Sequence, residues 1–249
     1  MMKCSAVSTT AAAASTAARR ILIACGSFAL IAAAWACFAP RPAAAAQFAG
    51  GDTYVYRIVN GYNNEPRGQV SYRVDRADAG RVVMSVLTEQ SGAALAATEI
   101  HTPDGNWLRH PLVNRARAVD YEFAQAYSNY ELPLDPGKQW TRRINASDPA
   151  TGATRSVRVD GAVVGPERVR VPAGEFDTIK IRRTVYAGDG DYPQSQTTIA
   201  ETDWFSPALG RSVRMARVSS YIDPPRGRHN QFVRGDWDIY ELVSAPPPR

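Results

Sequence analysis

The stretch Thr53-Tyr54-Val55-Tyr56-Arg57-Ile58 indicates the fold class of this 249-residue chain. Its alternation places the two tyrosines and the isoleucine on one face of an extended backbone. A period of two is that of a β-strand with one buried face. Residues 60–67 (NGYNNEPR) are rich in turn-forming side chains, and residues 69–74 and 81–88 alternate again. The sequence therefore predicts an antiparallel β-meander.

The same alternation returns toward the C-terminus. Apolar side chains occupy every second position there, and polar or charged side chains fill the positions between them. The apolar pairs are Val157 and Val159, Val169 and Val171, Ile179 and Ile181, and Val213 and Met215. An Asp104-Gly105 turn between residues 98–101 and 107–113 predicts a further hairpin. We therefore expect a mainly β protein.

One segment departs from this pattern. Residues 114–130 carry apolar side chains at steps of three and four residues, which is the spacing of one helical face. The side chains are those of Ala116, Val119, Phe123 and Tyr127. Pro133 and Pro136 would end such a helix, because proline lacks the backbone N–H. The sequence therefore predicts one short helix, or lid, in residues 114–130.

Residues 1–46 have the layout of a secretory signal peptide. They contain no acidic residue, and Arg19 and Arg20 precede an apolar run over residues 21–39 that leads to an alanine-rich end. We expect cleavage after Ala46, with the remaining 203 residues periplasmic or secreted. Two alternatives stay open: an uncleaved anchor, since such a run can span about 30 Å, and export by the twin-arginine route.

Removal of residues 1–46 changes the composition. All three cysteines lie there, so the mature chain offers neither a disulfide nor a thiolate for catalysis or metal binding. The full chain has a net charge of +5, but four of its 29 basic residues and none of its 24 acidic residues are removed. The mature chain is therefore close to neutral, at +1. This balance does not favour nucleic acid as a partner, and no transmembrane helix is expected after cleavage.

The mature chain is expected to form a single β-rich domain over residues 47–243, followed by a disordered tail over 244–249. Gly51-Asp52-Thr53-Tyr54 and Gly137-Lys138-Gln139-Trp140 match in kind, because each opens a strand with an aromatic residue after a glycine. Two interpretations stay open: halves 47–136 and 137–243 related by duplication, or a chance match.

The second half also carries an excess of basic residues. We expect a mildly cationic outer face there, built from Arg158, Arg168, Arg170, Lys180, Arg182 and Arg214. Such a face suits anionic lipid headgroups or polyanions. The alternative, which we favour, is that it is the solvated side of a half-buried sheet.

Recognisable catalytic and metal-binding motifs are missing from the mature chain. It has no serine elbow of the Gly-x-Ser-x-Gly type and no phosphate-cradling glycine loop. His101 and His110 flank the Asp104-Gly105 turn, and His229 lies in an expected loop, which is too few ligands for a zinc site. Residues 187–192 (AGDGDY) lack the later ligands of a calcium loop and are typical of a turn. No catalytic residue, metal or cofactor is therefore predicted.

Three signatures lie within residues 132–214. Leu132-Pro133-Leu134 is followed by Gly137-Lys138-Gln139-Trp140, then by Val171-Pro172-Ala173-Gly174-Glu175-Phe176-Asp177, and then by Trp204-Phe205-Ser206-Pro207-Ala208-Leu209-Gly210. As a set they resemble a group of uncharacterised bacterial exported β-rich proteins with Gly-Lys-x-Trp, Val-Pro-Ala-Gly-x-Phe-Asp and Trp-Phe-x-Pro-x-x-Gly signatures. That group looks related to the lipoprotein-carrier superfamily. None of the three motifs is catalytic.

The resemblance implies a fold and a ligand class. The fold would be a strongly curved antiparallel sheet, an open half-barrel with a helical lid, and the ligand would be hydrophobic or lipid-like. Aromatic side chains would line the concave face, and the candidates for ligand binding are Tyr54, Trp140, Trp204 and Phe205. The motifs themselves are expected to form turns at Pro172-Ala173-Gly174 and after Trp204.

Three functions follow as hypotheses. The first is a non-enzymatic exported protein that binds a hydrophobic or lipid-like ligand, or a partner protein in the cell envelope. The second is an envelope hydrolase acting on sugars or esters, with candidate residues His101, His110, His229, Asp203 and Asp236. The third is a structural module that binds a partner through exposed sheet edges.

Overall fold

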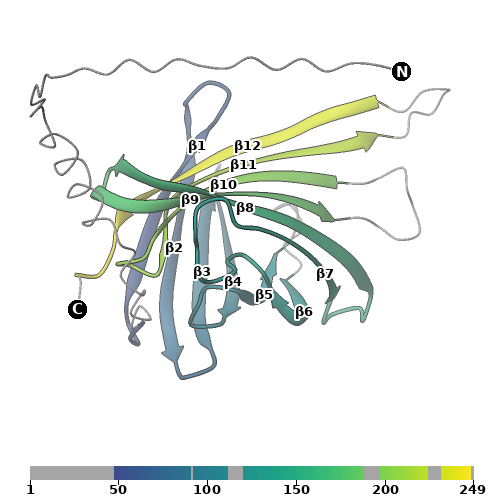
Figure 1. Ribbon diagram of the computed structural model, residues 1–249, viewed down its shortest axis with the longest axis horizontal. Coiled ribbons are helices and arrows are strands. Elements are labelled where there is room, and N and C mark those ends of the chain that lie inside the picture. The colour runs from purple at the N-terminus through teal and green to yellow at the C-terminus, as the bar shows by residue number, and fades with distance from the viewer. Residues whose placement is uncertain (1–47, 91, 112–119, 188–196, 224–230, 248–249) are drawn as a thin grey trace, which may run out of the picture. The chain divides into compact units, whose positions relative to one another are not determined.

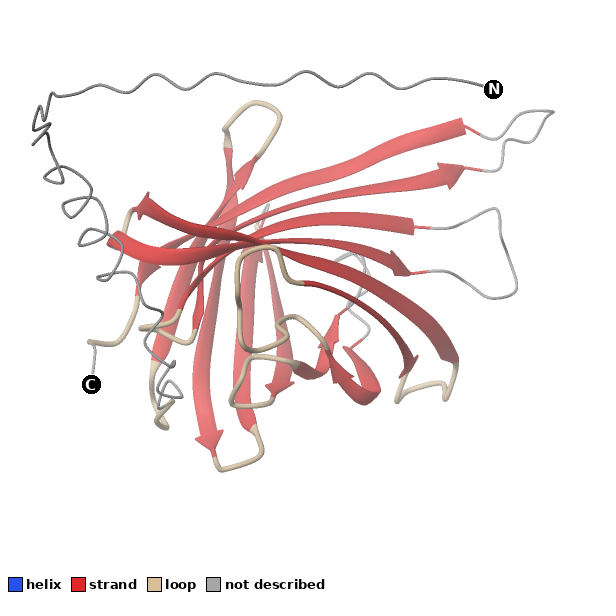
Figure 2. Cartoon of the chain, in the orientation of Figure 1, coloured by secondary structure: helices blue, strands red, loops and turns tan. Residues whose placement is uncertain are grey.

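The computed structural model describes residues 48–90, 92–111, 120–187, 197–223 and 231–247. All described residues belong to one compact unit, Pro42–Arg249. Every element of regular structure in these residues is a β-strand (Figure 2).

The described strands form one closed antiparallel barrel in which each strand pairs with its neighbours in sequence (Figure 1). Strand β1 also pairs with β12, with Ile58 opposite Tyr240, and this pairing closes the sheet. The strands are β1 (Thr53–Asn60), β2 (Pro66–Ala77), β3 (Val82–Gln90), β4 (Ala93–His101), β5 (Trp107–Pro111), β6 (Asp120–Tyr127), β7 (Gln139–Ser147), β8 (Thr154–Val171), β9 (Gly174–Ala187), β10 (Thr197–Ser206), β11 (Arg211–Asp223) and β12 (Gln231–Ser244).

Two expectations about the fold were wrong. The sheet is a closed barrel and not an open half-barrel, because β1 and β12 complete each other's hydrogen bonds and remove both free edges. In place of the helix predicted for residues 114–130, strand β6 covers residues 120–127 and an irregular segment covers residues 128–130. Residues 112–119 lie outside the described residues. Phe123 and Tyr127 are four residues apart, so both point to the same side in a strand as well as in a helix.

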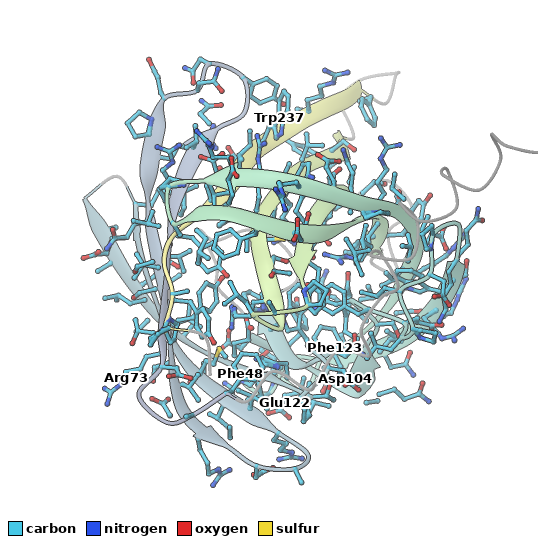
Figure 3. All side chains as sticks on the ribbon, turned by 60° about the vertical axis from the view of Figure 1, so that its left-hand side comes forward. Phe48, Arg73, Asp104, Glu122, Phe123 and Trp237 are labelled. Carbon is cyan, nitrogen blue, oxygen red and sulfur yellow. The ribbon has the colours of Figure 1, made fainter. Side chains whose placement is uncertain are left out.

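The alternation that predicted strand β1 is confirmed. Tyr54, Tyr56 and Ile58 are 5%, 5% and 0% exposed and pack in one hydrophobic cluster. Buried apolar side chains of β2 and β3 join them there, while polar side chains such as Arg73 lie on the outer face (Figure 3). Two smaller hydrophobic clusters form around Phe123 and around Trp140.

The predicted turn at Pro172-Ala173-Gly174 is also confirmed, because β8 ends at Val171 and β9 begins at Gly174. Gly174 has a φ of 132°, a conformation that other residues rarely adopt. The tip of this hairpin lies on the main core: Val169 and Val171 are buried there, and the Ala173 amide donates to the Leu242 carbonyl at 2.9 Å. The turn motif therefore anchors a long hairpin onto β12.

Both glycines of the proposed duplication precede a strand. Gly51 and Gly137 have φ values of 92° and 86°, and each is followed by a buried aromatic side chain three residues later, Tyr54 or Trp140. The two strand starts are therefore locally alike. Duplication, the single domain over residues 47–243 and the disordered tail remain predictions.

Candidate functional site

A cavity of about 80 Å³ lies among inward-facing side chains of the barrel. It is bounded by residues of eight strands and by the connection between β6 and β7, which we define as residues 128–138 and call the β6–β7 connection. Much of its lining is polar or ionisable, and these residues are Tyr56, Tyr72, Glu99, His101, His110, Asn129, Tyr130, Arg183, Asp203, Arg211 and Ser212.

A row of charges crosses three adjacent strands beside the cavity. Arg183 of β9, Glu201 of β10 and Arg217 of β11 are direct partners in the strand register. Glu201 accepts hydrogen bonds or ion pairs from both arginines, at 3.1 Å from Arg183 Nε and 3.2 Å from Arg217 Nε. The side chains of Arg183 and Glu201 are each 1% exposed. The pairing is therefore fixed by the sheet and shielded from water.

Asp203 lies two residues after Glu201 and faces the same way. One carboxylate oxygen accepts from Arg183 Nη2 at 3.0 Å and from the Tyr130 hydroxyl at 2.9 Å, and the other accepts from the Ser212 hydroxyl. Burial favours the neutral form of Arg183, but the charges of Asp203 and Glu201 outweigh it and raise the pKa of Arg183. Burial also favours the neutral form of the Tyr130 hydroxyl and therefore raises its pKa. Asp203 is thus held as the centre of a closed hydrogen-bond network.

On β4 and β5, an imidazole–carboxylate pair lines the cavity. His110 Nδ1 lies 3.1 Å from Glu99 Oε2, and the His110 ring stacks on Trp107 with ring centres 3.6 Å apart. Burial would raise the pKa of Glu99, but the hydrogen bond and charge of His110, together with the charge of Arg211, lower it to about 2. Glu99 is therefore ionised at neutral pH, and His110 is fixed in orientation.

His101, also on β4, is only 3% exposed. Its Nδ1 lies 2.7 Å from the Thr102 carbonyl, which can only accept, so Nδ1 carries the hydrogen. Burial is the largest influence on its pKa and lowers it. The neutral ring at physiological pH then has Nε2 as an acceptor.

Arg211 enters the cavity from the start of β11. Its guanidinium lies 5.0 Å from the ring centre of Tyr54 and 4.5 Å from that of Tyr72. Nε donates to the Tyr56 hydroxyl at 3.4 Å, and Nη1 lies 2.7 Å from the Met84 thioether. Burial would lower the pKa of Arg211, but neighbouring Tyr56 and Glu99 raise it. Two aromatic rings therefore hold a cation at the cavity wall.

The β6–β7 connection closes one side of the cavity. The Tyr130 amide donates to Asn106 Oδ1 at 2.8 Å, and Asn106 Nδ2 returns a bond to the Tyr130 carbonyl at 3.0 Å. Asn129 Nδ2 donates to the Gly105 carbonyl at 3.0 Å. A Cβ at Gly105 would lie 2.9 Å from the Tyr130 ring, so a larger residue would displace that ring. The Asn106 side chain and the Gly105 carbonyl of the β4–β5 turn thus fix the connection in place.

The four aromatic residues predicted to bind ligand lie elsewhere. Tyr54 and Trp204 belong to one hydrophobic cluster, and Trp140 and Phe205 belong to another; all four are at most 8% exposed. None of the four is among the residues that line this cavity. A Cβ at Gly161 would overlap the Trp140 ring, so that indole fills a space left by a glycine. Their role in ligand binding remains a prediction, and their contacts are those of core residues.

Three residues of the hydrolase hypothesis do converge. His101, His110 and Asp203 line the same cavity. Asp236 does not, because its side chain is 74% exposed and pairs with Arg67 at 2.9 Å. His229 lies outside the described residues.

Sequence reasoning missed several cavity residues, above all Glu99, Asn129, Arg183 and Arg211. The sequence did contain a pattern that marks two of the buried charged residues, Arg183 and Glu201. Arg183 alternates with buried Ile181 and Val185, and so takes an inward position on its strand. Glu201 does the same after Ile199. A charge in the apolar phase of a strand is therefore the pattern to look for.

Other kinds of site find no support in the described part of the chain. No group of three or more His, Cys, Asp or Glu side chains that could hold a metal occurs among the described residues. No helix there could cross a membrane.

Neither the known protein families nor the curated proteins contain a match to this sequence. Among solved structures, a Bacteroides fragilis protein described as exported, with a YmcC-like fold, is 16% identical, with a TM-score of 0.47 over 80% of this chain and 97% of its own. A protein from Parabacteroides distasonis described as a lipoprotein is 13% identical, with a TM-score of 0.47 over 80% and 96%.

A third similar structure is the hypothetical lipoprotein YmcC of Escherichia coli. It is 12% identical, with a TM-score of 0.39 over 79% of this chain and 85% of its own. At TM-scores below 0.5 these similarities do not define the fold or the site, which stand on the geometry described above.

Proposed function

We propose that this protein is exported and binds a small polar ligand in the barrel cavity, without catalysing a reaction. The observation that carries the proposal is the concentration of ionisable side chains around that cavity, including Arg183 and Asp203, whose side chains are 1% and 2% exposed. Buried ion pairs rarely stabilise a fold more than apolar side chains of similar volume. A functional use of the polar interior explains its presence better than stability does.

The size and lining of the cavity favour a polar group over an acyl chain. Binding sites for drug-sized molecules usually enclose about 300 to 1,000 Å³. The 80 Å³ found here corresponds to only a few water molecules. The lipid-like ligand implied by the sequence resemblance would therefore place no more than its headgroup in this cavity.

Export is supported by residues 1–46, whose basic, apolar and small-residue segments follow one another in the order of a signal peptide. A binding protein in the envelope would need no cofactor, which agrees with a role based on hydrogen bonding and charge.

Native mass spectrometry of the mature chain, purified from the periplasm of its host, tests the proposal. We expect a small polar molecule at near-unit stoichiometry, with its occupancy reduced in Asp203→Asn. Asp160→Asn is the matched control, because Asp160 pairs with Arg158 on the outer surface. A bare protein mass in every preparation, or equal occupancy in both variants, would contradict binding in this cavity. A bound lipid would return the sequence-based ligand class to first place.

A second candidate function is an ester hydrolase, and the Glu99–His110 pair favours it. A carboxylate bound to Nδ1 orients an imidazole so that Nε2 can act as a general base. Nε2 of His110 would take a proton from water, whose oxygen attacks the ester carbonyl; the same proton would then pass to the departing alkoxide. Turnover of chromogenic short-chain esters that is lost in His110→Ala but kept in His101→Ala would support this function. Equal rates in both variants would exclude it.

The partner-binding hypothesis remains a prediction. The pairing of β1 with β12 closes one edge, whereas among the described residues β6 and β7 pair only through Glu122 with Ser147 and Phe123 with Ala146, so a partner strand would add along the rest of β7.

A further inference from the structure

Two groups in the cavity keep hydrogen-bonding capacity that the described residues do not use. Most of the polar lining is saturated: Arg183 alone directs Nε, Nη1 and Nη2 to three different oxygen atoms. Arg211 and Asn129 differ from it. What they lack defines what a ligand must supply.

The Arg211 guanidinium is poorly supplied with acceptors. One of its bonds is a 3.4 Å contact with the Tyr56 hydroxyl, and another reaches the Met84 thioether, a weak acceptor. No carboxylate of the described residues lies within ion-pair distance of it. A guanidinium offers five N–H donors in a planar fork that suits carboxylate or phosphate. Arg211 therefore has no direct ion pair among the described residues, and the charge of Glu99 acts on it only through space.

Asn129 has the opposite requirement, because its side chain has an acceptor without a donor among the described groups. Its side chain is 2% exposed and lines the cavity, yet Oδ1 has no hydrogen-bond partner in the described part of the chain. Its Nδ2 is engaged by the Gly105 carbonyl, which fixes the amide and leaves Oδ1 as the acceptor. A buried acceptor of this kind costs free energy until it meets a donor.

The two acidic side chains in the cavity do not supply the acceptor that Arg211 lacks. Asp203 is held by Arg183, Tyr130 and Ser212, and Glu99 by His110. Each of these carboxylates has direct partners other than Arg211, and Glu99 reaches Arg211 only through space.

We infer that the ligand carries an acidic group, a carboxylate or phosphate, for Arg211 and a hydroxyl or ammonium donor for Asn129 Oδ1. This inference rests on the proposed function, since it names the chemistry of the ligand in the same cavity. The acidic group has two sources, a small free anion or the headgroup of an anionic lipid.

Thermal unfolding of the mature chain with lactate, propionate and lactamide tests the free anion at constant ionic strength. Lactate has both groups, propionate lacks the hydroxyl, and lactamide lacks the charge. We expect the largest rise in Tm with lactate, a smaller one with propionate and none with lactamide. Equal rises with lactamide and lactate would overturn the inference, and this comparison needs no variant to fold.

Two variants assign the groups. Arg211→Gln should weaken lactate binding about ten- to hundredfold, as expected for loss of a charged hydrogen bond. Arg170→Gln removes the same charge from a side chain that is 81% exposed and should bind lactate normally. Asn129→Leu should reduce lactate affinity to that of propionate. Unchanged lactate affinity in both Arg211→Gln and Asn129→Leu would place the anion elsewhere and overturn the assignment.

Flotation with phosphatidic acid vesicles tests the lipid source. Vesicle binding that Arg211→Gln abolishes and Arg170→Gln preserves would support the same recognition with a lipid headgroup. Failure of both lactate and these vesicles would overturn the inference. The inference and the proposed function can fail separately. A neutral polar molecule in the native mass spectrum would support the proposed function and would reject an acidic ligand.

Discussion

The inner and outer surfaces of the barrel use the same arginine–carboxylate chemistry in opposite settings. Inside, the Arg183–Glu201 pair is 1% exposed on both sides. Outside, the Arg170–Glu175 pair is 81% and 48% exposed. Similar outer pairs join Arg158 to Asp160, Arg168 to Asp177, Lys180 to Glu167 and Arg214 to Glu241.

This difference in exposure gives the outer and the inner charges different electrostatic effects. Five of the six basic residues predicted to form a cationic face have an acidic neighbour on that face, so their field is neutralised locally. This favours the solvated side of a sheet over a lipid-binding patch. The inner charges, which are removed from water, have large electrostatic consequences.

The largest expected effect comes from removing the inner cation. Arg183→Met leaves Glu201 and Asp203 buried without that partner, and the free energy of unfolding should fall by about 3 to 5 kcal/mol. Urea denaturation measures the loss. The triple variant Arg183→Met, Glu201→Leu, Asp203→Leu should recover most of it, because no buried carboxylate is then left without its cation and Arg217, which loses Glu201, is 22% exposed and can be hydrated. A triple variant as unstable as the single one would show that the network is needed for folding.

Trp204 packs in the main hydrophobic cluster and also contacts charged side chains of the outer surface. Its replacement by Ala should lower the free energy of unfolding by about 3 kcal/mol. Its indole is 8% exposed, lies 5.0 Å from both Lys180 Nζ and the Arg214 guanidinium, and donates to Glu167 Oε1 at 3.0 Å. Trp204→Ala should therefore lower the urea midpoint while any ligand affinity stays unchanged. Loss of affinity with normal stability would restore Trp204 as a ligand-binding residue.

Protonation in acid should reduce stability more for an inner carboxylate than for an outer one. The pKa of Glu99 is lowered from 4.5 to about 2 in the folded state, so its stabilisation is present above pH 4.5 and is lost as the pH falls toward 2. That loss amounts to about 2 to 3 kcal/mol. Chemical denaturation between pH 5 and pH 2 should be flatter for Glu99→Gln than for the parent chain. Asp177→Asn, on the outer surface, should leave the pH dependence nearly unchanged; parallel curves for all three proteins would contradict the comparison.

The smallest effect is expected on the outer surface. Arg170→Gln breaks an exposed pair that solvent and salt screen, so its urea midpoint should match that of the parent chain. A clear shift at low salt that disappears at high salt would show that the outer pairs act together as a network.

Local sequence pattern predicted the parts that depend on nearest neighbours. The alternation of Tyr54, Tyr56 and Ile58 identified a buried face, and Pro172-Ala173-Gly174 identified a turn. It did not predict that β1 pairs with β12, since that pairing joins residues about 180 positions apart and depends on the curvature of the whole sheet. The spacing of Phe123 and Tyr127 was ambiguous because four residues suit both a strand and a helix.

The sequence by itself determined a β-rich chain whose three cysteines all lie within a signal-like N-terminal segment, and the positions of several strands and turns. It named His101, His110 and Asp203 as candidates without showing that they share one cavity. Only the tertiary structure brought them together with Arg183, Arg211 and Asn129. The reason is physical: strand alternation fixes which way a side chain points, whereas barrel closure decides which distant side chains it meets.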